Sequence, residues 1–444
     1  MTRLIYRLYR LLTWLNYWVP RRFTPTGLLV LISMAVGGAV GMDMDQSMSF
    51  QVFLLAFCLL AVSISAACFF RGRFVVERAL PRFASVGQPV AYPIKVSNRT
   101  AKTFRGLELL EGLTDPRPTL AEFTAARKAA ARGRSFRLSL AASPSLNVRQ
   151  ATVKPVSLPV LPPNGEAETQ VEVIPLRRGL LRFTGATVAR PNAFGLFRAF
   201  ARVSAPGKVL VLPKRYPLPA LALPGARKYQ QGGVALASAI GQSDEFVALR
   251  DYRPGDPMRH IHWRSWARAG RPIVREFQDE FFVRHALILD TFAGTEKGAA
   301  FEEAVSVAAS FACSLDTQES LLDLMFVGPQ AIHFTVGRGV SHVEQALEIL
   351  ASVRACPEKP FQLLRDLVLE HAGQVCGGVC LFLDWDEPRR ELVRRLRALG
   401  LPMLVLVVAD EDLDKKLQSQ YSGQAPEGFR VLRLGEIAEG LRSL

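Results

Sequence analysis

Two uncharged apolar stretches near the N-terminus constrain this chain of 444 residues more than any other feature. Phe23–Met42 and Phe50–Phe70 contain no Lys, Arg, Asp or Glu. Each is about as long as a helix must be to cross the hydrocarbon core of a bilayer. We therefore predict a hairpin of two transmembrane helices within residues 23–73.

The charges around these stretches indicate how such a hairpin is oriented. The residues before the first stretch include Arg3, Arg7, Arg10, Arg21 and Arg22, and the second stretch is followed by Arg71 and Arg73. The charged residues in the turn between the stretches are both acidic, Asp43 and Asp45. Because Lys and Arg remain on the cytoplasmic side, we predict a two-pass protein of the inner (cytoplasmic) membrane. Both termini and the main body are then cytoplasmic. A cleaved signal peptide fits poorly, since the second stretch also ends in arginines.

Residues 1–22 mix aromatic side chains with the arginines. The aromatic residues are Tyr6, Tyr9, Trp14, Tyr17 and Trp18. This mixture is typical of a helix that lies on anionic headgroups, so membrane lipid is one predicted partner. Within the first apolar stretch, Gly37 and Gly41 form a G-x-x-x-G step, which favours close packing of the two membrane helices.

Residues 74–217 are predicted to be β-rich. Short runs of alternating apolar and polar residues are separated by Gly, Pro and Asn, which favours a small antiparallel β-sandwich. Residues 99–215 contain twenty Lys or Arg against seven Asp or Glu, whereas the chain from Tyr216 onward contains twenty-five against thirty. We interpret the excess, part of it in a basic loop around Arg127–Arg137, as holding the sandwich near anionic lipid. The loop has no recognised nucleic-acid motif, so no nucleic acid is expected.

Residues 285–444 alternate continuous apolar runs with amphipathic ones. This alternation predicts a mostly parallel, doubly wound α/β sheet. Ligands of such sheets gather at the carboxyl ends of the strands, where Asp290, Asp384 and Asp386 are expected. Cys376 and Cys380 have no second cysteine pair or histidine at zinc-site spacing, so both are predicted to pack in the core.

Residues 218–284 form a linker that contains the most concentrated run of charge, Asp244–Glu280. This run has seven arginines and seven acids. Interleaved charges of both signs favour a fixed network of Arg–carboxylate pairs over a nucleic-acid patch. Pro254 and Gly255 are predicted at the centre of a tight turn. Trp263 and Trp266 are predicted to anchor the segment by burial.

The same segment raises two chemical hypotheses. His260 and His262 would share a metal only on a strand, where both face one side. Asp256 together with these histidines would make an acid–base set for a hydrolase. Against this, the chain has no P-loop, G-x-S-x-G elbow or H-E-x-x-H motif. Nearby arginines also lower carboxylate pKa values. We therefore predict that the protein is not an enzyme and needs no cofactor.

The segment also resembles the signature of domain-of-unknown-function family 58. The elements that carry the resemblance are Glu245-Phe246, Leu249-Arg250, Tyr252, Pro254-Gly255-Asp256, Arg259, Ile261, Trp263 and Ala267-Arg268. The order of membrane hairpin, sandwich and α/β body is similar to that family's layout. The resemblance implies a von Willebrand A-like α/β domain and a MoxR-type AAA+ ATPase as partner.

Metal-binding von Willebrand A domains carry Asp-x-Ser-x-Ser after their first strand, and those oxygens coordinate a divalent cation. Here Phe292 and Gly294 stand at the two serine positions. Asp384 or Asp386 would add a carboxylate, but two ligands make a poor site. We predict that Asp290 instead caps or hydrogen-bonds the turn that follows the strand.

These features together predict an α/β von Willebrand A-like doubly wound sheet, preceded by a transmembrane helical hairpin and a small antiparallel β-sandwich. The predicted function is that of a membrane-anchored cytoplasmic scaffold acting with the ATPase in protein assembly or maturation. The predicted partner-binding motif consists of Glu245, Arg250, Tyr252, Gly255, Asp256, Arg259, His262, Trp263 and Arg268. A hydrolase, and anionic-lipid or nucleic-acid binding through the basic sandwich, remain as alternatives.

Overall fold

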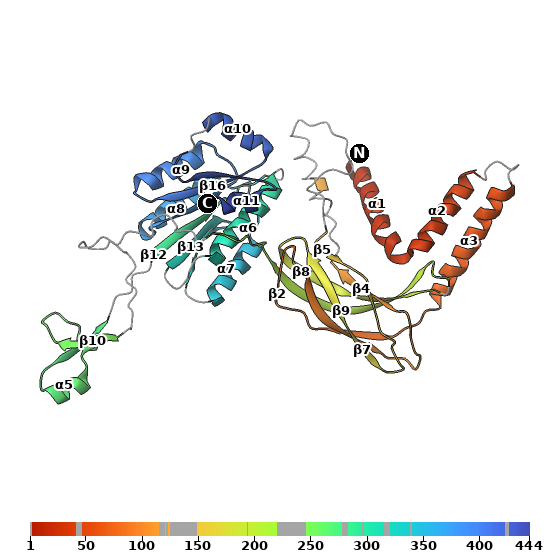
Figure 1. The fold of residues 1–444 in the computed structure, drawn as a ribbon, viewed down its shortest axis with the longest axis horizontal. Coiled ribbons are helices and arrows are strands. Elements are labelled where there is room, and N and C mark those ends of the chain that lie inside the picture. The colour runs from red at the N-terminus through yellow and green to blue at the C-terminus, as the bar shows by residue number, and fades with distance from the viewer. Residues whose placement is uncertain are drawn as a thin grey trace. The chain divides into compact units, whose positions relative to one another are not determined.

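The computed structural model divides the chain into two compact units (Figure 1). Unit 1 consists of Met1–Lys214 with Glu348–Ser352, and unit 2 of Arg215–Leu347 with Val353–Leu444. The structure describes residues 2–40, 47–114, 120, 123–124, 149–192, 194–219, 246–277, 283–294, 297–314, 320–337, 340–421 and 426–444. Asp43, Asp45, Gly41, Glu245 and the basic loop at Arg127–Arg137 lie outside these residues.

Unit 1 begins with three helices, α1 (Thr2–Arg22), α2 (Pro25–Val40) and α3 (Ser47–Cys68). Helices α2 and α3 lie side by side (Figure 1), and Gly37 and Gly38 of α2 face Phe53 of α3. The close approach predicted at Gly37 is therefore confirmed. Among the described residues, one helix is long and apolar enough to cross a membrane, over Met48–Cys68.

The first predicted membrane stretch is shorter in the structure than in the sequence pattern. Helix α2 has 16 residues, which span roughly 24 Å at 1.5 Å per residue. It starts late because Thr24 caps it: the Gly27 amide donates to Thr24 Oγ1 at 3.0 Å, and Pro25 occupies the first helical position. Phe23 lies outside the helix, where it is buried and forms a β-bridge with Phe197.

The rest of unit 1 is a β-sandwich, as predicted. One sheet has the strand order β1 (Phe74–Arg78), β3 (Val90–Asn98), β7 (Glu166–Pro175) and β5 (Ala151–Val153). The other has the order β2 (Phe83–Ser85), β9 (Arg198–Leu212), β8 (Gly179–Pro191), β4 (Glu108–Leu113) and β6 (Val156–Ser157). All pairs are antiparallel except β2 with β9. Apolar side chains of both sheets, including Ile94 and Val188, form the core between them.

A buried ion pair also lies in the sandwich, which the sequence pattern did not indicate. Arg78 of β1 and Glu111 of β4 come from different sheets, and their charged atoms are 2.9 Å apart. Their side chains are only 4% and 1% exposed. A pair so far from water is costly to break, because either charge alone would be left without a partner.

Unit 2 contains a six-stranded sheet with the order β14 (Ala331–Val336), β13 (Ser320–Val327), β12 (Val283–Leu289), β15 (Gly377–Phe382), β16 (Met403–Ala409) and β17 (Phe429–Arg433). The five strands from β13 to β17 in this order are parallel, and β14 is antiparallel to β13. The predicted mostly parallel α/β sheet is therefore confirmed.

Helices cover this sheet on both faces. They are α6 (Gly298–Ser314), α8 (Gln362–His371), α9 (Glu387–Ala398), α10 (Glu411–Tyr421) and α11 (Ile437–Arg442), with a short η4 (Ala372–Gln374). Helix α7 (Val340–Ser352) follows β14, and its last residues, Glu348–Ser352, belong to unit 1. Ile288 and its neighbours pack under α8, α9 and α10, whereas the alternating residues Leu287 and Leu289 are fully buried on the opposite face. Helices α8, α10 and α11 were not predicted. Cys380 is fully buried in this core, as predicted, and Cys376 is half-buried.

The charged segment folds into a small module of its own, residues 246–277. Strands β10 (Phe246–Asp251) and β11 (Ile273–Phe277) pair antiparallel. Between them lie a 3-10 turn, η2 (Met258–His260), and a short helix, α5 (Trp263–Ala269). Ile261 bridges to Val274, and these two side chains are the buried ones in the described part of the module.

Candidate interaction site

A tight turn at Arg253–Asp256 shapes the tip of the module. The Asp256 amide donates to the Arg253 carbonyl oxygen at 3.1 Å, so Pro254 and Gly255 occupy the two central positions, as predicted. Gly255 has a φ of 107°. Side chains other than glycine are strained in that conformation, which explains why glycine is needed here.

A two-pronged ion pair holds this turn against the end of β10. Arg250 Nη1 donates to Asp256 Oδ2 at 2.7 Å, and Nη2 donates to Oδ1 at 2.8 Å. The Arg253 amide adds a third hydrogen bond to Asp256 at 2.8 Å. The Arg250 guanidinium, and then the Arg253 amide, lower the pKa of Asp256 to about 2. Asp256 is therefore an ionised structural acceptor and a poor proton donor.

The two histidines belong to different elements, so they do not line up as on a strand. His260 ends η2, where its Nε2 lies 3.2 Å from Arg259 Nε. His262 precedes α5, and its Nδ1 lies 2.7 Å from Ser265 Oγ. Its backbone amide donates to the Ile273 carbonyl oxygen at 2.8 Å, which fixes the start of α5 beside β11. Within the described ranges, no group of three His, Cys, Asp or Glu side chains is placed to hold a metal ion.

The prediction that the tryptophans anchor the segment by burial is wrong for Trp263. Its side chain is 63% exposed and stacks on Trp266, with ring centroids 5.1 Å apart. Met258 is 74% exposed. The reason is size, because helix α5 has seven residues and buries none of them. A module this small leaves its large apolar side chains at the surface, which is typical of an interaction site.

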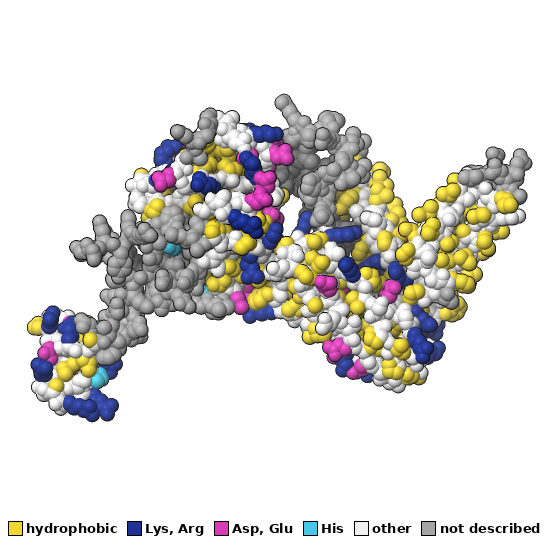
Figure 2. All heavy atoms as spheres, in the orientation of Figure 1, with side chains coloured by type: hydrophobic (Ala, Val, Ile, Leu, Met, Phe, Trp, Pro, Cys, Tyr) yellow, Lys and Arg dark blue, Asp and Glu magenta, His cyan; other side chains and the backbone are white. Residues whose placement is uncertain are grey.

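The arginines of the module outnumber its acids. Residues 246–277 contain seven Arg and three acids, Asp251, Asp256 and Glu276. Arg250 pairs with Asp256, and Arg271 pairs with Asp251 at 3.1 Å. The other five arginines form no ion pair with any residue in the described ranges: Arg253, Arg259, Arg264, Arg268 and Arg275. Asp244, Glu245, Asp279 and Glu280 of the charged run lie outside the described residues, so the predicted network is seen here in its Arg250–Asp256 and Arg271–Asp251 pairs. Dark blue side chains mark the surface of the module (Figure 2).

The remaining predicted motif residues have modest roles in the structure. The Tyr252 amide donates to the Pro272 carbonyl oxygen at 3.0 Å, which continues the pairing beyond the strand ends. Arg268 lies in the last turn of α5, where a positive charge favours the helix dipole. Gly270, with a φ of 68°, ends the helix by donating its amide to the Trp266 carbonyl oxygen at 2.9 Å.

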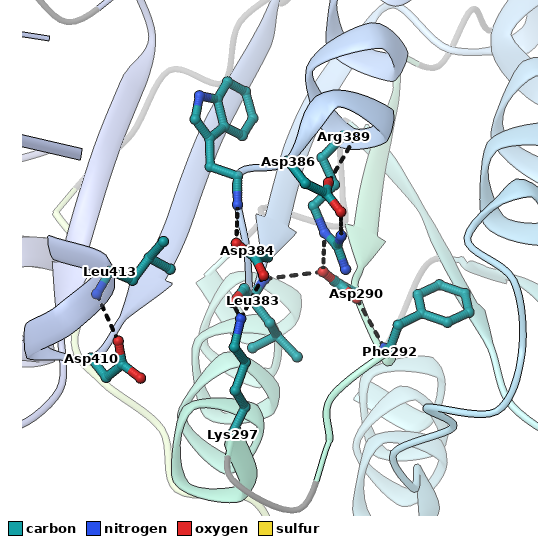
Figure 3. Close-up of polar contacts among 10 residues, drawn as sticks. Asp290, Phe292, Lys297, Leu383, Asp384, Asp386, Arg389, Asp410 and Leu413 are labelled. Carbon is teal, nitrogen blue, oxygen red and sulfur yellow. Dashed lines mark hydrogen bonds and ion pairs between the residues drawn. The ribbon is translucent and has the colours of Figure 1, made fainter. Parts of the chain in front are cut away.

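A second candidate site lies at the carboxyl ends of the parallel strands (Figure 3). Asp290 follows β12, Asp384 follows β15, and Asp386 caps α9. Asp290 is fully buried, and both of its oxygens have partners. Oδ1 accepts from the Phe292 amide at 2.9 Å, whereas Oδ2 accepts from the Leu383 amide at 3.1 Å and from Arg389 Nε at 2.7 Å. The predicted hydrogen bond from Asp290 to the turn after the strand is confirmed.

Two basic side chains of the chain itself stand among these carboxylates. Arg389 also donates from Nη1 to Asp386 at 2.7 Å, and Lys297 Nζ donates to Asp384 at 2.6 Å. Burial alone lowers the pKa of Arg389, but Asp290 and Asp386 raise it by more, so the guanidinium stays charged. For Asp384 burial has the opposite sign and raises the pKa, but the hydrogen bond from Lys297 outweighs it, so the pKa lies below its ordinary value. Arg389 and Lys297 therefore supply the positive charge that a cation would bring.

The sequence pattern identified the three carboxylates at this edge but missed their partners. Arg389 lies three residues after Asp386, in the first turn of a helix, and this i, i+3 spacing was the available signal. Lys297 offers no comparable signal, because it meets Asp384 from a segment 87 residues away. Asp410, which follows β16 and accepts from the Leu413 amide at 2.9 Å, was also missed.

Comparisons with known proteins agree with the signature. The family model described as protein of unknown function DUF58 matches residues 248–406, which begin in β10 and end in β16. The uncharacterized protein YeaD of Bacillus subtilis (strain 168) is 31% identical over 126 residues. That match spans 28% of this chain and 31% of YeaD.

Solved structures are similar to this chain only weakly. The CARDB domain of the PF1109 protein from Pyrococcus furiosus is 14% identical, with a TM-score of 0.17, and the match covers 32% of this chain and 91% of that one. A Salmonella alpha-2-macroglobulin is 15% identical with a TM-score of 0.18, over 34% of this chain and 8% of that one. The likeness is too low to support any functional conclusion. The DUF58 match over residues 248–406 and the YeaD relative together support a DUF58-family protein.

Proposed function

We propose that this protein is a membrane-anchored cytoplasmic scaffold whose signature module, residues 246–277, binds a protein partner. The carrying observation is exposed Trp263, stacked on half-buried Trp266, in a module whose residues 246–277 contain seven arginines and three acids. Exposed Trp and Arg are the side chains most enriched at the energetic centres of protein interfaces. Because the arginines are positive, the matching surface on the partner is acidic.

The proposed partner is a MoxR-type AAA+ ATPase, and the proposed role is protein assembly or maturation. This choice rests on the family resemblance. The module supports a non-catalytic role, since its best-placed carboxylate, Asp256, is committed to Arg250 and to the Arg253 amide. His262 is likewise engaged with Ser265 at the start of α5.

The proposed anchor is the α2–α3 pair. Met48–Cys68 in α3 is long and apolar enough to span a bilayer, and α2 supplies a shorter apolar helix. The arginines before α2 and after α3, including Arg21 and Arg73, support a two-pass arrangement with the body in the cytoplasm. Resistance of the full-length protein to carbonate extraction tests the anchor, and recovery in the soluble fraction would contradict it.

The partner is tested by copurification of the detergent-extracted full-length protein with the ATPase. Trp263→Ala and the double change Arg264→Ala/Arg268→Ala are expected to lose most of the copurified ATPase, because hot-spot truncations cost about 2 kcal/mol or more, or roughly thirtyfold in affinity. Matched controls are Leu399→Ala, 61% exposed on the α/β domain, and Arg354→Ala, an exposed arginine there. Equal ATPase recovery from all variants contradicts the proposed site.

The hydrolase alternative makes a separate prediction. A hydrolase would turn over substrate as purified full-length protein and lose that activity in His262→Ala. The scaffold proposal expects no turnover above that of His262→Ala with ester, phosphoester or peptide substrates. Measured turnover that depends on His262 would replace the scaffold proposal with an enzymatic one.

A further inference from the structure

A pocket of about 490 Å³ lies in unit 1 where helix α3 meets the sandwich. Its wall combines Ala66 and Ala67 of α3, and Phe69 and Phe70 just after that helix, with residues of the sandwich. The polar sandwich residues in the wall are Arg105, Arg190 and Asn192. The volume is within the range of small-molecule sites, roughly 300–1,000 Å³. The pocket is distinct from the signature module and from the strand-edge carboxylates, and neither of those sites uses its residues.

The polar groups that line this pocket are donors, and none of its lining residues is acidic. Arg105 and Arg190 are exposed, and neither guanidinium forms a hydrogen bond or an ion pair with another described residue. Asn192 Oδ1 already accepts from the Leu196 and Phe197 amides, whereas its buried Nδ2 donor has no partner in the described residues. Two guanidinium groups and a spare amide donor favour an anion with several oxygens, as in a phosphate group.

The apolar part of the wall lies at the end of the proposed membrane span. The span ends at Cys68, and Ala66 and Ala67 belong to its last turn. Phe69, which follows, is 82% exposed. Exposed arginines Arg71 and Arg73 come next. Aromatic and basic residues at this position are typical of the headgroup level of a bilayer. A ligand here has its charged group near the arginines and apolar chains along α3.

Close contacts between the start of α2 and the sandwich fix the position of the pocket relative to the helices. At the start of α2, the Thr24 amide donates to the Leu196 carbonyl oxygen at 3.2 Å, and Thr26 Oγ1 donates to the Gly195 carbonyl oxygen at 3.0 Å. The Phe23 and Phe197 rings lie 5.2 Å apart, edge to face. A Cβ on Gly27 would meet the Leu196 carbonyl oxygen at 1.9 Å, so only glycine permits this approach. The sandwich therefore packs directly against the start of α2.

We propose that this junction pocket binds the phosphate group of an anionic phospholipid, with Arg105, Arg190 and Asn192 as donors and Phe69 against the acyl region. The proposal rests on the membrane anchoring proposed above, because a soluble protein would not meet the lipid at this level. Free phosphate would bind the same donors, but it has no apolar group to contact the apolar wall of the pocket. Bulk attraction to an anionic surface would not depend on which arginines are present.

The test compares two full-length double variants that lose the same charge. Arg105→Gln/Arg190→Gln removes the pocket arginines, whereas Arg149→Gln/Arg177→Gln removes two exposed sandwich arginines that do not line it. Each protein is extracted in a non-ionic detergent, and its retained phospholipid is counted by native mass spectrometry. Binding of short-chain phosphatidylglycerol, short-chain phosphatidylcholine and inorganic phosphate is then measured for each. Thermal melts confirm that both variants remain folded.

The wild type and the control pair are expected to retain phosphatidylglycerol, and the pocket pair to bind it at least about tenfold more weakly, or about 1.4 kcal/mol. If both double variants lose phosphatidylglycerol binding equally, general charge attraction explains the binding and the pocket proposal is overturned. Equal binding of phosphatidylcholine overturns the requirement for a net anionic headgroup, and equal binding of inorganic phosphate overturns the lipid. Carbonate extraction tests the membrane anchor separately. If the protein resists carbonate extraction but Arg105→Gln/Arg190→Gln still binds phosphatidylglycerol normally, the pocket proposal is refuted and the anchor proposal stands.

Discussion

Two arginine–aspartate pairs in unit 2 use the same chemistry in opposite surroundings. Arg250 and Asp256 in the signature module have side chains 32% and 16% exposed, whereas Arg389 and Asp290 at the strand edge are 7% and 0% exposed. The exposed pair shapes a surface turn. The buried pair neutralises a carboxylate that has no access to water. Burial thus decides whether such a pair fixes a surface turn or maintains the integrity of the sheet.

The largest predicted effect comes from breaking the buried pair. Arg389→Met leaves Asp290 charged and unpaired in the core, and removal of one partner of a buried pair costs about 3–5 kcal/mol. Thermal or denaturant unfolding of the full-length protein in detergent measures this loss. The second change Asp290→Asn is expected to restore part of the stability, since it removes the unpaired charge. An Arg389→Met protein as stable as the wild type would falsify the assignment.

The reactivity of the Cys380 thiol, on β15, is a second measure of how well the sheet is packed. Burial raises the pKa of this thiol to about 12, so the reactive thiolate is scarce at neutral pH. We expect iodoacetamide to modify half-buried Cys376 before Cys380 in the native protein, as followed by peptide mass spectrometry. Arg389→Met is expected to accelerate modification of Cys380 by loosening the sheet edge. Native Cys380 reacting as fast as Cys376 contradicts the buried core.

The exposed pair is expected to have a local effect. Arg250→Ala removes both prongs from Asp256 but leaves the Arg253 amide bond. We expect a much smaller change in global unfolding than for Arg389→Met, because exposed pairs contribute little to stability. Hydrogen exchange of the Arg253 and Asp256 amides is expected to accelerate. A fall in global stability equal to that of Arg389→Met would remove the contrast between the two pairs.

The smallest effect is expected from pH. The pKa of Asp256 is lowered from 3.8 to about 2 by Arg250 and by the Arg253 amide. A lowered folded-state pKa means that its stabilisation is complete above pH 3.8 and is lost as the pH falls through about 2. The turn is therefore insensitive to pH between 5 and 8. Carboxyl carbon NMR of labelled Asp256 measures this, and Arg250→Ala is expected to move the titration towards pH 3.8.

Much of the fold followed from local patterns. The parallel strands of unit 2 are continuous apolar runs, and the sandwich strands alternate, so both were predicted from residues near in sequence. The turn at Pro254-Gly255 was predicted for the same reason. Helix α8 was missed, although Leu364, Leu367 and Val368 recur at helical spacing and are buried. The burial assigned to Trp263 failed because exposure depends on what packs around a side chain.

The sequence by itself determined the strand and helix patterns, the turn chemistry and the family signature, because each depends on residues within a few positions of one another. Only the tertiary structure decided which charges meet. Lys297 reaches Asp384, Arg389 reaches Asp290, and Arg105 and Arg190 come to line one pocket from separate parts of the sandwich. Side chains so far apart along the chain meet only after the chain folds, and burial then sets the strength of each contact.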